Sequence, residues 1–293
     1  MRLAGVAIRG ASAVGDLPAF EISPMSRVCW LTDIHFDFVA RGGIERFLDR
    51  VEEEQADWVL VGGDIGEARN VTEYLARIAA RLSARVAFVL GNHDFYRGSI
   101  RRVRGTMTEL CRNVPRLFYL NDVDVLELAP QVGLIGHDGW ADARVGDYDR
   151  SQVMLSDYLL IAELAPATKR ERRGMLEALG DEAASHVRRV LPQALARYEE
   201  VVLLTHVPPL REACWHEGRL SDDEWAPHFT CLAVGEAILE IMPQWPQRQL
   251  TVLCGHTHSA GECRPLDNVL ILTGEAKYGA PTIQRIWQFA WQV

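Results

Sequence analysis

The sequence predicts an α/β domain in which strands and helices alternate and stack in layers. Short apolar runs typical of buried strands alternate with longer segments of helical periodicity along the whole chain. Hydrophobic residues make up 48% of the 293 residues and charged residues 24%, a globular composition that excludes intrinsic disorder as the main state. No repeat or linker divides the chain, so we expect one domain over residues 26–293, preceded by an N-terminal arm or edge strand over residues 1–25.

Eight strands are predicted from apolar runs, several of them continuous, as in strands covered on both faces. They span residues 27–32, 57–61, 85–90, 123–128, 132–136, 201–205, 251–254 and 268–272. Four helices are predicted at residues 43–55, 71–83, 99–112 and 168–198. In the first of these, Ile44, Phe47 and Val51 recur at helical spacing and give one buried stripe. Residues 282–292 alternate between apolar and polar side chains, which predicts a closing antiparallel strand.

The net charge and the cysteine content indicate which kinds of partner the protein binds and in which cellular compartment it lies. The net charge of −9 repels the phosphate backbone, so we expect no binding of long nucleic acids. No run approaches the roughly 18 consecutive apolar residues of a membrane span, so we expect no membrane insertion. The six cysteines form no C-x-x-C pair, which is typical of reduced thiols and predicts a cytoplasmic protein. The apolar run near the N-terminus is short and is broken by Arg9, which argues against an export signal.

Five apolar strands are each followed at once by polar side chains of the kinds that bind metals. The segments are LTDIH at 31–35, VGGD at 61–64, VLGNHD at 89–94, LTH at 204–206 and LCGHTH at 253–258. In open α/β sheets the carboxyl ends of the strands form the binding edge, so five such ends can converge on one site. Asp33 and His35 are two residues apart, as are His256 and His258, and an extended segment points such a pair to one side.

The candidate ligands of this predicted site are nitrogen and oxygen donors. They are Asp33, His35, Asp64, Asn92, His206, His256 and His258. Singly, each has an ordinary alternative, because an aspartate after a strand often caps a helix and a lone histidine often packs under a loop. Together, a mixture of carboxylate, amide and imidazole without thiolate favours Mn, Fe, Zn, Ni or Co, and it does not fit a structural zinc site.

In their order along the chain, the five motifs resemble the signature of the calcineurin-like metallophosphoesterases. The matching blocks are D-x-H, G-G-D, G-N-H-D, a single histidine and G-H-x-H, and they extend from Asp33 to His258. The resemblance implies a four-layer α/β/β/α sandwich of two mixed sheets flanked by helices. It also implies an enzyme that hydrolyses a phosphate ester with the help of two divalent transition-metal ions.

The resemblance further implies a role for each ligand and for two neighbouring residues. It assigns Asp33, His35 and His258 to one ion, Asn92, His206 and His256 to the other, and Asp64 to both. His93 would be the catalytic acid, and Asp94 would orient it. A hydroxide shared by the two ions would attack the phosphorus.

Three residues outside this set are candidates for substrate contact. Arg97 belongs to a group of arginines after G-N-H-D and would bind a second phosphate or a carboxylate, although a solvated helix start explains the same arginines. Tyr96 would flank the same opening. Trp140 would stack on a base or ring, with burial in the core as its alternative. The long polar segment 207–230 is expected to be a lid or substrate loop.

The sequence thus predicts a phosphoesterase that acts on a small phosphorylated substrate. The arginines and Trp140 favour a phosphodiester or a nucleotide-type substrate. A phosphomonoesterase is the alternative within the same family. A binding scaffold without turnover is the alternative from another class, and the intact His93 argues against it. The motifs leave the oligomeric state open.

Overall fold

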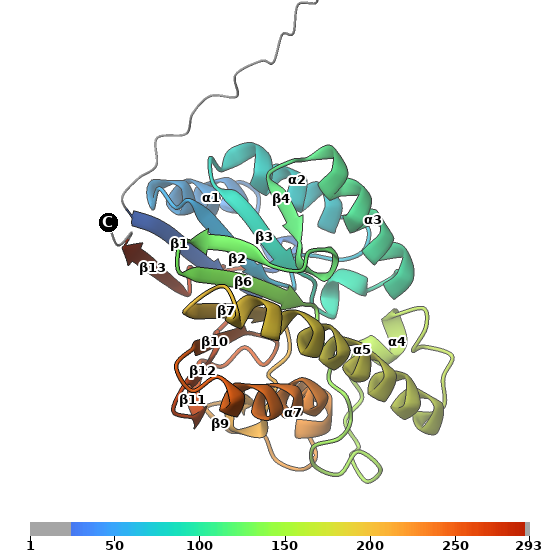
Figure 1. The fold of residues 1–293 in the computed structure, drawn as a ribbon. Coiled ribbons are helices and arrows are strands. Elements are labelled where there is room, and N and C mark those ends of the chain that lie inside the picture. The colour runs from blue at the N-terminus through green and yellow to red at the C-terminus, as the bar shows by residue number, and fades with distance from the viewer. Residues whose placement is uncertain (1–24, 291–293) are drawn as a thin grey trace, which may run out of the picture.

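The computed structural model describes residues 25–290, in which two mixed β-sheets pack face to face between two groups of helices (Figure 1). Five strands of this range form the first sheet, in the order β13-β1-β2-β3-β4. They are β1 (Met25–Leu31), β2 (Trp58–Gly62), β3 (Arg85–Val89), β4 (Leu117–Tyr119) and β13 (Arg285–Ala290). Strands β1 to β4 are parallel, and β13 pairs with β1 in the antiparallel direction.

The second sheet has the order β11-β12-β10-β7-β6-β5. Its strands are β5 (Leu126–Ala129), β6 (Val132–His137), β7 (Glu200–Thr205), β10 (Gln249–Cys254), β11 (Gly261–Leu266) and β12 (Val269–Thr273). The four inner strands are parallel, and the two edge strands β5 and β11 are antiparallel to their neighbours. Parallel inner strands direct all their carboxyl ends to one edge, which is where a site is expected in such sheets.

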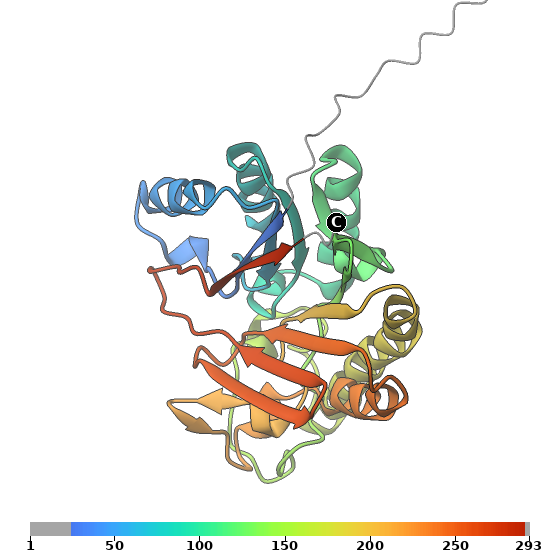
Figure 2. The same ribbon diagram turned by 60° about the vertical axis from the view of Figure 1, so that its left-hand side comes forward.

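Helices cover the outer face of each sheet, as Figure 2 shows in a turned view. The first sheet carries α1 (Gly43–Glu53), α2 (Val71–Arg81) and α3 (Ile100–Asn113), and the second carries α5 (Lys169–Leu195) and α7 (Leu232–Ile241). The shorter elements are α4 (Asp157–Leu160), α6 (Ala226–Phe229) and a hairpin of β8 (Trp215–His216) and β9 (Arg219–Leu220). Local signals set the helix starts: Ser99 accepts a bond from the Arg102 amide, and Thr168 and Glu171 form a capping box.

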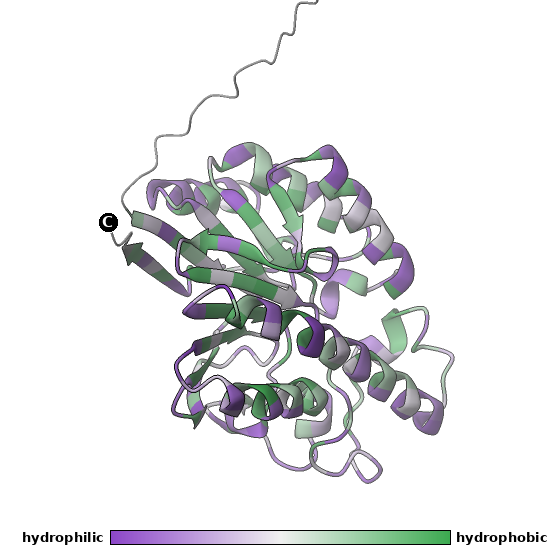
Figure 3. Cartoon of the chain, in the orientation of Figure 1, coloured by the Kyte–Doolittle hydropathy of each residue, from purple (hydrophilic) through white to green (hydrophobic). Residues whose placement is uncertain are grey.

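Apolar side chains fill three slabs between the four layers, and the strands carry most of the hydrophobic colour in Figure 3. The middle slab lies between the sheets and contains Leu60, Leu204 and Leu253. The outer slabs join each sheet to its helices, for example through Phe47 of the predicted stripe on α1. The α/β/β/α sandwich of two mixed sheets that the sequence predicted is therefore confirmed.

All predicted strands and helices are present in the structure, with shifted ends, and the closing strand is β13. The strands and α-helices that were not predicted are β4, β11 and α7, together with the short α4, α6, β8 and β9. Strand β4 has three residues, β11 is interrupted by a register shift between Cys263 and Leu266, and α7 is apolar on most of its faces. Such elements lack the periodicity on which sequence prediction depends.

Two expectations concern the ends of the chain and the membrane. The predicted N-terminal arm lies outside the described residues, except for Met25, which begins β1. Among the helices of the described part, none combines the length and the apolar character needed to cross a membrane.

Candidate metal centre

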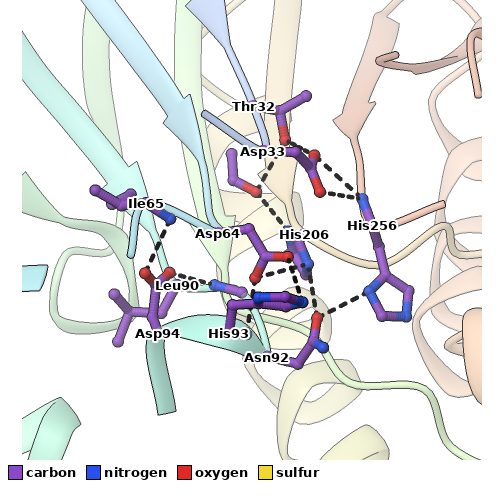
Figure 4. Close-up of polar contacts among 12 residues, drawn as sticks. Thr32, Asp33, Asp64, Ile65, Leu90, Asn92, His93, Asp94, His206 and His256 are labelled. Atoms are coloured by element: carbon purple, nitrogen blue, oxygen red, sulfur yellow. Dashed lines mark hydrogen bonds and ion pairs between the residues drawn. The ribbon is translucent and has the colours of Figure 1, made fainter. Parts of the chain in front are cut away.

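The seven predicted ligands come together at the rim where the carboxyl ends of both sheets meet. Figure 4 shows five of them: Asp33, Asp64, Asn92, His206 and His256. Asp33 and His35 follow β1, Asp64 follows β2, Asn92 follows β3, His206 follows β7, and His256 and His258 follow β10. Three of the five strands belong to the first sheet and two to the second. The face-to-face packing of the sheets therefore builds the site, because neither sheet supplies a complete ligand set alone.

One group of donors contains Asp33, His35, Asp64 and His258, whose ligand atoms all lie within 4.8 Å of one another. His35 Nε2 is 3.1 Å from His258 Nε2 and 3.6 Å from Asp64 Oδ2, and His258 Nε2 is 3.4 Å from Asp33 Oδ1. Burial lowers the pKa of His35 to about 2, so this ring is neutral and offers a lone pair. Two carboxylates and two imidazoles at these separations fit a divalent transition metal.

A second group of donors surrounds the side-chain oxygen of Asn92. The Asn92 amide nitrogen donates to Asp157 Oδ1 at 2.8 Å and to the Tyr96 hydroxyl at 3.1 Å. These bonds fix the amide so that its Oδ1 points away from them, 3.2 Å from His206 Nε2 and 2.9 Å from His256 Nδ1. One amide oxygen and two ring nitrogens are thus held together.

The hydrogen bonds on the far side of these two rings assign their tautomers. His206 Nδ1 lies 2.8 Å from the Gly62 carbonyl, and His256 Nε2 lies 3.1 Å from the His228 carbonyl. A carbonyl oxygen only accepts, so these nitrogens carry the protons and the other ring nitrogens carry lone pairs. Each lone pair then faces the Asn92 oxygen, which is also an acceptor. A cation between them turns this repulsive arrangement into a ligand set, so the residues fit a second metal ion.

Asp64 lies between the two groups. Its Oδ2 is the atom near His35, and its Oδ1 is 3.4 Å from His206 Nε2. Burial, followed by the charges of Asp33 and Asp94, raises the pKa of Asp64 well above its ordinary value. Positive charge on both sides would stabilise the ionised carboxylate, and two divalent cations supply it.

The backbone around the ligands is strained in a consistent way. Positive φ angles between 39° and 70° occur at Asp33, His35, Asp64, His256 and His258, which are five of the nine such non-glycine residues in the described range. Each left-handed residue costs on the order of 1 kcal/mol, and such strain is concentrated at functional sites. Two glycines also allow close approach: a Cβ at Gly91 would collide with Asp64 Oδ1, and one at Gly255 with Asp33 Oδ2.

His93, the predicted catalytic acid, lies at the edge of the donor groups. Its backbone amide donates to Asp64 Oδ1 at 2.9 Å, and its ring centroid is 4.6 Å from that of His35 and 4.3 Å from that of Tyr96. Burial, followed by repulsion from His206, lowers the pKa of His93 to about 3. An anionic phosphate beside the ring would favour its protonated form.

Asp94 does not reach the His93 ring, contrary to the orienting role expected for it. Its carboxylate accepts three backbone bonds, each 2.9 Å long, from the amides of Ile65, Gly66 and Gly91. The side chain therefore joins the turn after β2 to the turn after β3 (Figure 4). These bonds hold the backbone of the loop that carries Asn92 and His93.

The site opens into a cavity of about 260 Å³. Asp64, Asn92, His93, His256 and His258 lie at its base. Its walls combine apolar or aromatic side chains, among them Tyr96, Leu155, Phe229 and Tyr278, with polar ones such as Asp157. No lysine or arginine of the described chain lines it.

Of the three predicted substrate contacts, only Tyr96 lines this cavity. Its hydroxyl donates to Asp157 Oδ1 at 2.7 Å, so it also supports the Asn92 ligand. Arg97 points instead to Glu67, with which it forms an ion pair, and this pairing occupies the guanidinium expected to bind a substrate anion. Trp140 is 4% exposed and packs 5.6 Å from the Phe95 ring, so its buried indole has no free face for a substrate ring.

Four residues of the site were not found in the sequence. Asp157 at the start of α4 fixes the Asn92 amide, and His228 positions His256 through its carbonyl. Phe229 and Tyr278 form parts of the cavity wall. His228 and Phe229 lie in segment 207–230, which was predicted to be a lid or substrate loop. No local pattern distinguishes any of the four from ordinary loop residues.

Comparison with known proteins gives the same family as the motifs. A model described as calcineurin-like phosphoesterase matches residues 26–260. The chain belongs to this family. The protein is therefore a metal-dependent phosphoesterase by family, with a buried cluster of aspartate and histidine ligands. No curated protein sequence matches the chain.

Solved structures show the same fold in distant members. The phosphopantetheinyl hydrolase PptH from Mycobacterium tuberculosis has a TM-score of 0.61 at 15% identity, and the match covers 87% of this chain and 91% of that one. A dimetal phosphatase from Danio rerio has a TM-score of 0.52 at 17% identity, with 87% and 89% covered. The protein TT1561 of Thermus thermophilus has a TM-score of 0.53 at 12% identity, with 92% and 100% covered. At these identities the likeness concerns the fold.

Proposed function

We propose that this phosphoesterase hydrolyses a small phosphodiester at the site between its two sheets, with two divalent transition-metal ions bound there. Asp33, His35 and His258 would hold one ion, Asn92, His206 and His256 the other, and Asp64 both. When bound, the two ions would supply a shared hydroxide and positive charge for the phosphoryl oxygens. The observation that carries the proposal is the pair of imidazole lone pairs aimed at the Asn92 oxygen, an arrangement that needs a cation.

The protein's own contribution to the reaction would come from His93. Its ring lines the cavity beside Asp64 and keeps 16% of its side chain exposed, so a substrate can touch it. We expect the ring to take up a proton together with the anionic substrate and to give it to the departing oxygen. A positioned acid of this kind contributes roughly 10²- to 10⁴-fold to the rate.

The preference for a diester rests on charge. Two divalent ions, two ligand aspartates and one hydroxide leave a net charge of about +1, and the Asp157 carboxylate, which also lines the cavity, lowers it to about zero. A phosphodiester monoanion therefore leaves less uncompensated negative charge in the cavity than a monoester dianion does. A monoester dianion would need a further cation, and no lysine or arginine from the described residues lines the cavity. Arg97 and Trp140, from which the sequence favoured a diester, do not support that preference in the structure, because Arg97 is paired and Trp140 is buried.

The test is a substrate panel assayed with protein stripped of metal and then reloaded. Bis-p-nitrophenyl phosphate, p-nitrophenyl phosphate, cyclic nucleotides, dinucleoside polyphosphates and phosphopantetheinyl compounds would each be tested with Mn, Fe, Ni, Zn and Co. The phosphopantetheinyl compounds belong in the panel because one protein of similar fold is a phosphopantetheinyl hydrolase. We expect diester turnover only after reloading. Faster turnover of monoesters would refute the diester preference, and bound metal without turnover of any ester would favour the binding scaffold.

A single substitution tests the role of His93. His93→Asn should lower kcat by roughly 10²-fold or more while two metal ions per chain remain bound, because the imidazole is not a ligand. Loss of metal from this variant would show that His93 serves the metal centre instead.

The cytoplasmic location stays a prediction. It is supported by the six cysteines of the chain, which are all unpaired in the structure.

A further inference from the structure

Two exposed aromatic rings touch each other beside the metal centre. Among the described residues, eight large hydrophobic side chains are exposed, and Phe38 and Tyr278 are the two aromatic ones. Phe38 is 52% exposed and Tyr278 47%, and their ring centroids are 4.6 Å apart. Single exposed apolar residues need no explanation, but adjacent exposed rings at the mouth of a cavity are typical of a binding surface.

The two rings come from distant parts of the chain and are held against the ligands. Phe38 ends the short helical turn that follows His35, and Tyr278 lies in the loop between β12 and β13. The Tyr278 ring centroid is 4.7 Å from that of His35 and 5.0 Å from that of His258. The amide of Ala276, in the same loop, donates to the His258 carbonyl at 3.3 Å. The loop of Tyr278 is thus fixed to a ligand loop, with one side of its ring left open.

The rings also lie on the same side of the site as His93. The Tyr278 ring centroid is 6.2 Å from that of His93, and both side chains line the cavity. If His93 gives its proton to the departing oxygen, the group attached to that oxygen must lie next to His93. Tyr96 is closer to His93 but is only 5% exposed, whereas Tyr278, with Phe38 beside it, offers an exposed aromatic surface for such a group.

We propose that Phe38 and Tyr278 form a leaving-group platform, which binds an uncharged aromatic ring on the departing arm of a phosphodiester. Ring pairs stack favourably at centroid separations of about 4.5–7 Å. In the reaction, hydroxide forms a new P–O bond, the P–O bond to the leaving group breaks, and its electron pair takes the proton from His93. The absence of lysine and arginine from the cavity lining, over the residues the structure describes, favours an arm without its own charge.

This inference rests on the proposed hydrolysis, so the experiment must separate the two. Benzyl methyl phosphate offers one aromatic and one small arm, whose alcohols have similar acidity. The ratio of benzyl alcohol to methanol released is an internal competition that does not depend on metal loading or on the folded fraction. We expect wild-type protein to release benzyl alcohol in roughly three- to tenfold excess.

Substitutions at the two rings test whether the platform causes the excess of benzyl alcohol. Tyr278→Ala should bring the ratio close to one, Phe38→Ala should lower it, and Tyr278→Phe should preserve it because the ring remains. Leu239→Ala, which removes an exposed apolar side chain on α7, should leave the ratio unchanged. A wild-type ratio near one, or a ratio that survives Tyr278→Ala, would overturn the platform. No release of either alcohol would instead count against the proposed function.

Binding gives a second measurement that needs no turnover. By calorimetry, benzylphosphonate should bind the metal-loaded protein roughly three- to tenfold more tightly than methylphosphonate, and Tyr278→Ala should abolish this difference. Equal affinities in the wild-type protein would contradict the platform.

Discussion

Asp157 should control the affinity of the metal centre although it is not itself a predicted ligand. It is 3% exposed, and its Oδ1 accepts bonds from the Asn92 amide nitrogen at 2.8 Å and from the Tyr96 hydroxyl at 2.7 Å. Burial raises the pKa of Asp157, and the bonds from Tyr96 and Asn92 act in the opposite direction. Replacing Asp157 with alanine leaves the Asn92 amide free to rotate, so that its NH₂ group can replace its oxygen at the metal position.

The size of the effect follows from the bond that is lost. A hydrogen bond to a charged group contributes roughly 1.5–3 kcal/mol, which corresponds to about a 10- to 150-fold change in an equilibrium constant. The loss of a group that orients a metal ligand typically costs about 10- to 100-fold in metal affinity. For Asp157→Ala we therefore expect about 10- to 100-fold weaker binding of the ion held by Asn92, His206 and His256.

Chelator competition followed by calorimetry would measure the two ions separately. The ion held by Asp33, His35 and His258 should change by less than about threefold, because Asp157 makes no contact with these side chains. Tyr96→Phe is the matched control, since it removes the bonds of the Tyr96 hydroxyl to Asp157 and Asn92 but leaves the bond from Asn92 to Asp157. Equal weakening of both ions, or unchanged affinity for both, would refute the reasoning.

Two further predictions concern close packing and pH. Gly91→Ala should lower the metal content, because the new Cβ collides with Asp64, whereas Gly105→Ala on α3 meets no atom and should stabilise the fold by about 0.5–1 kcal/mol in urea unfolding. Burial, and to a lesser extent the charges of Arg104 and His186, lower the pKa of His137 well below its ordinary value. The folded protein therefore binds this proton less readily than the unfolded chain does. The contribution of His137 to the free energy of unfolding is present above pH 6.5 and is lost as the pH falls. With chelator present, we expect the free energy of unfolding to fall between pH 7 and pH 5 as His137 becomes protonated in the unfolded chain. His137→Asn should flatten that dependence, and an unchanged pH slope would contradict it.

The layered fold was predictable because its main elements carry strong local patterns. The strands around Leu60 and Leu203 contain continuous apolar runs, and α1 has one clear apolar stripe. The pairing of strands into two sheets was not visible in these patterns. The resemblance to a family supplied it, and the structure confirmed it.

Contacts from other segments turn two of the predicted substrate residues away from the cavity: Arg97 is exposed but paired with Glu67, and Trp140 is buried. Arg97 and Trp140 belong to residue types that often contact ligands, and both lie near the ligand motifs in the chain. Whether such a side chain faces a cavity depends on neighbours from other segments. Glu67 binds Arg97, and Phe95 packs against Trp140.

The sequence by itself determined the kind of chemistry. Each metal-binding side chain lies within a few residues of the end of a strand, so its position relative to that strand is fixed along the chain. Asp33 and His35, or His256 and His258, cannot separate far because they are two residues apart. What only the tertiary structure decided was everything that depends on contact between distant segments. The bond from Asn92 to Asp157 spans 65 residues, and Tyr278 reaches His35 and His93 from the loop that leads into the last strand. Such contacts arise because two sheets and their loops pack together, and no local periodicity records them.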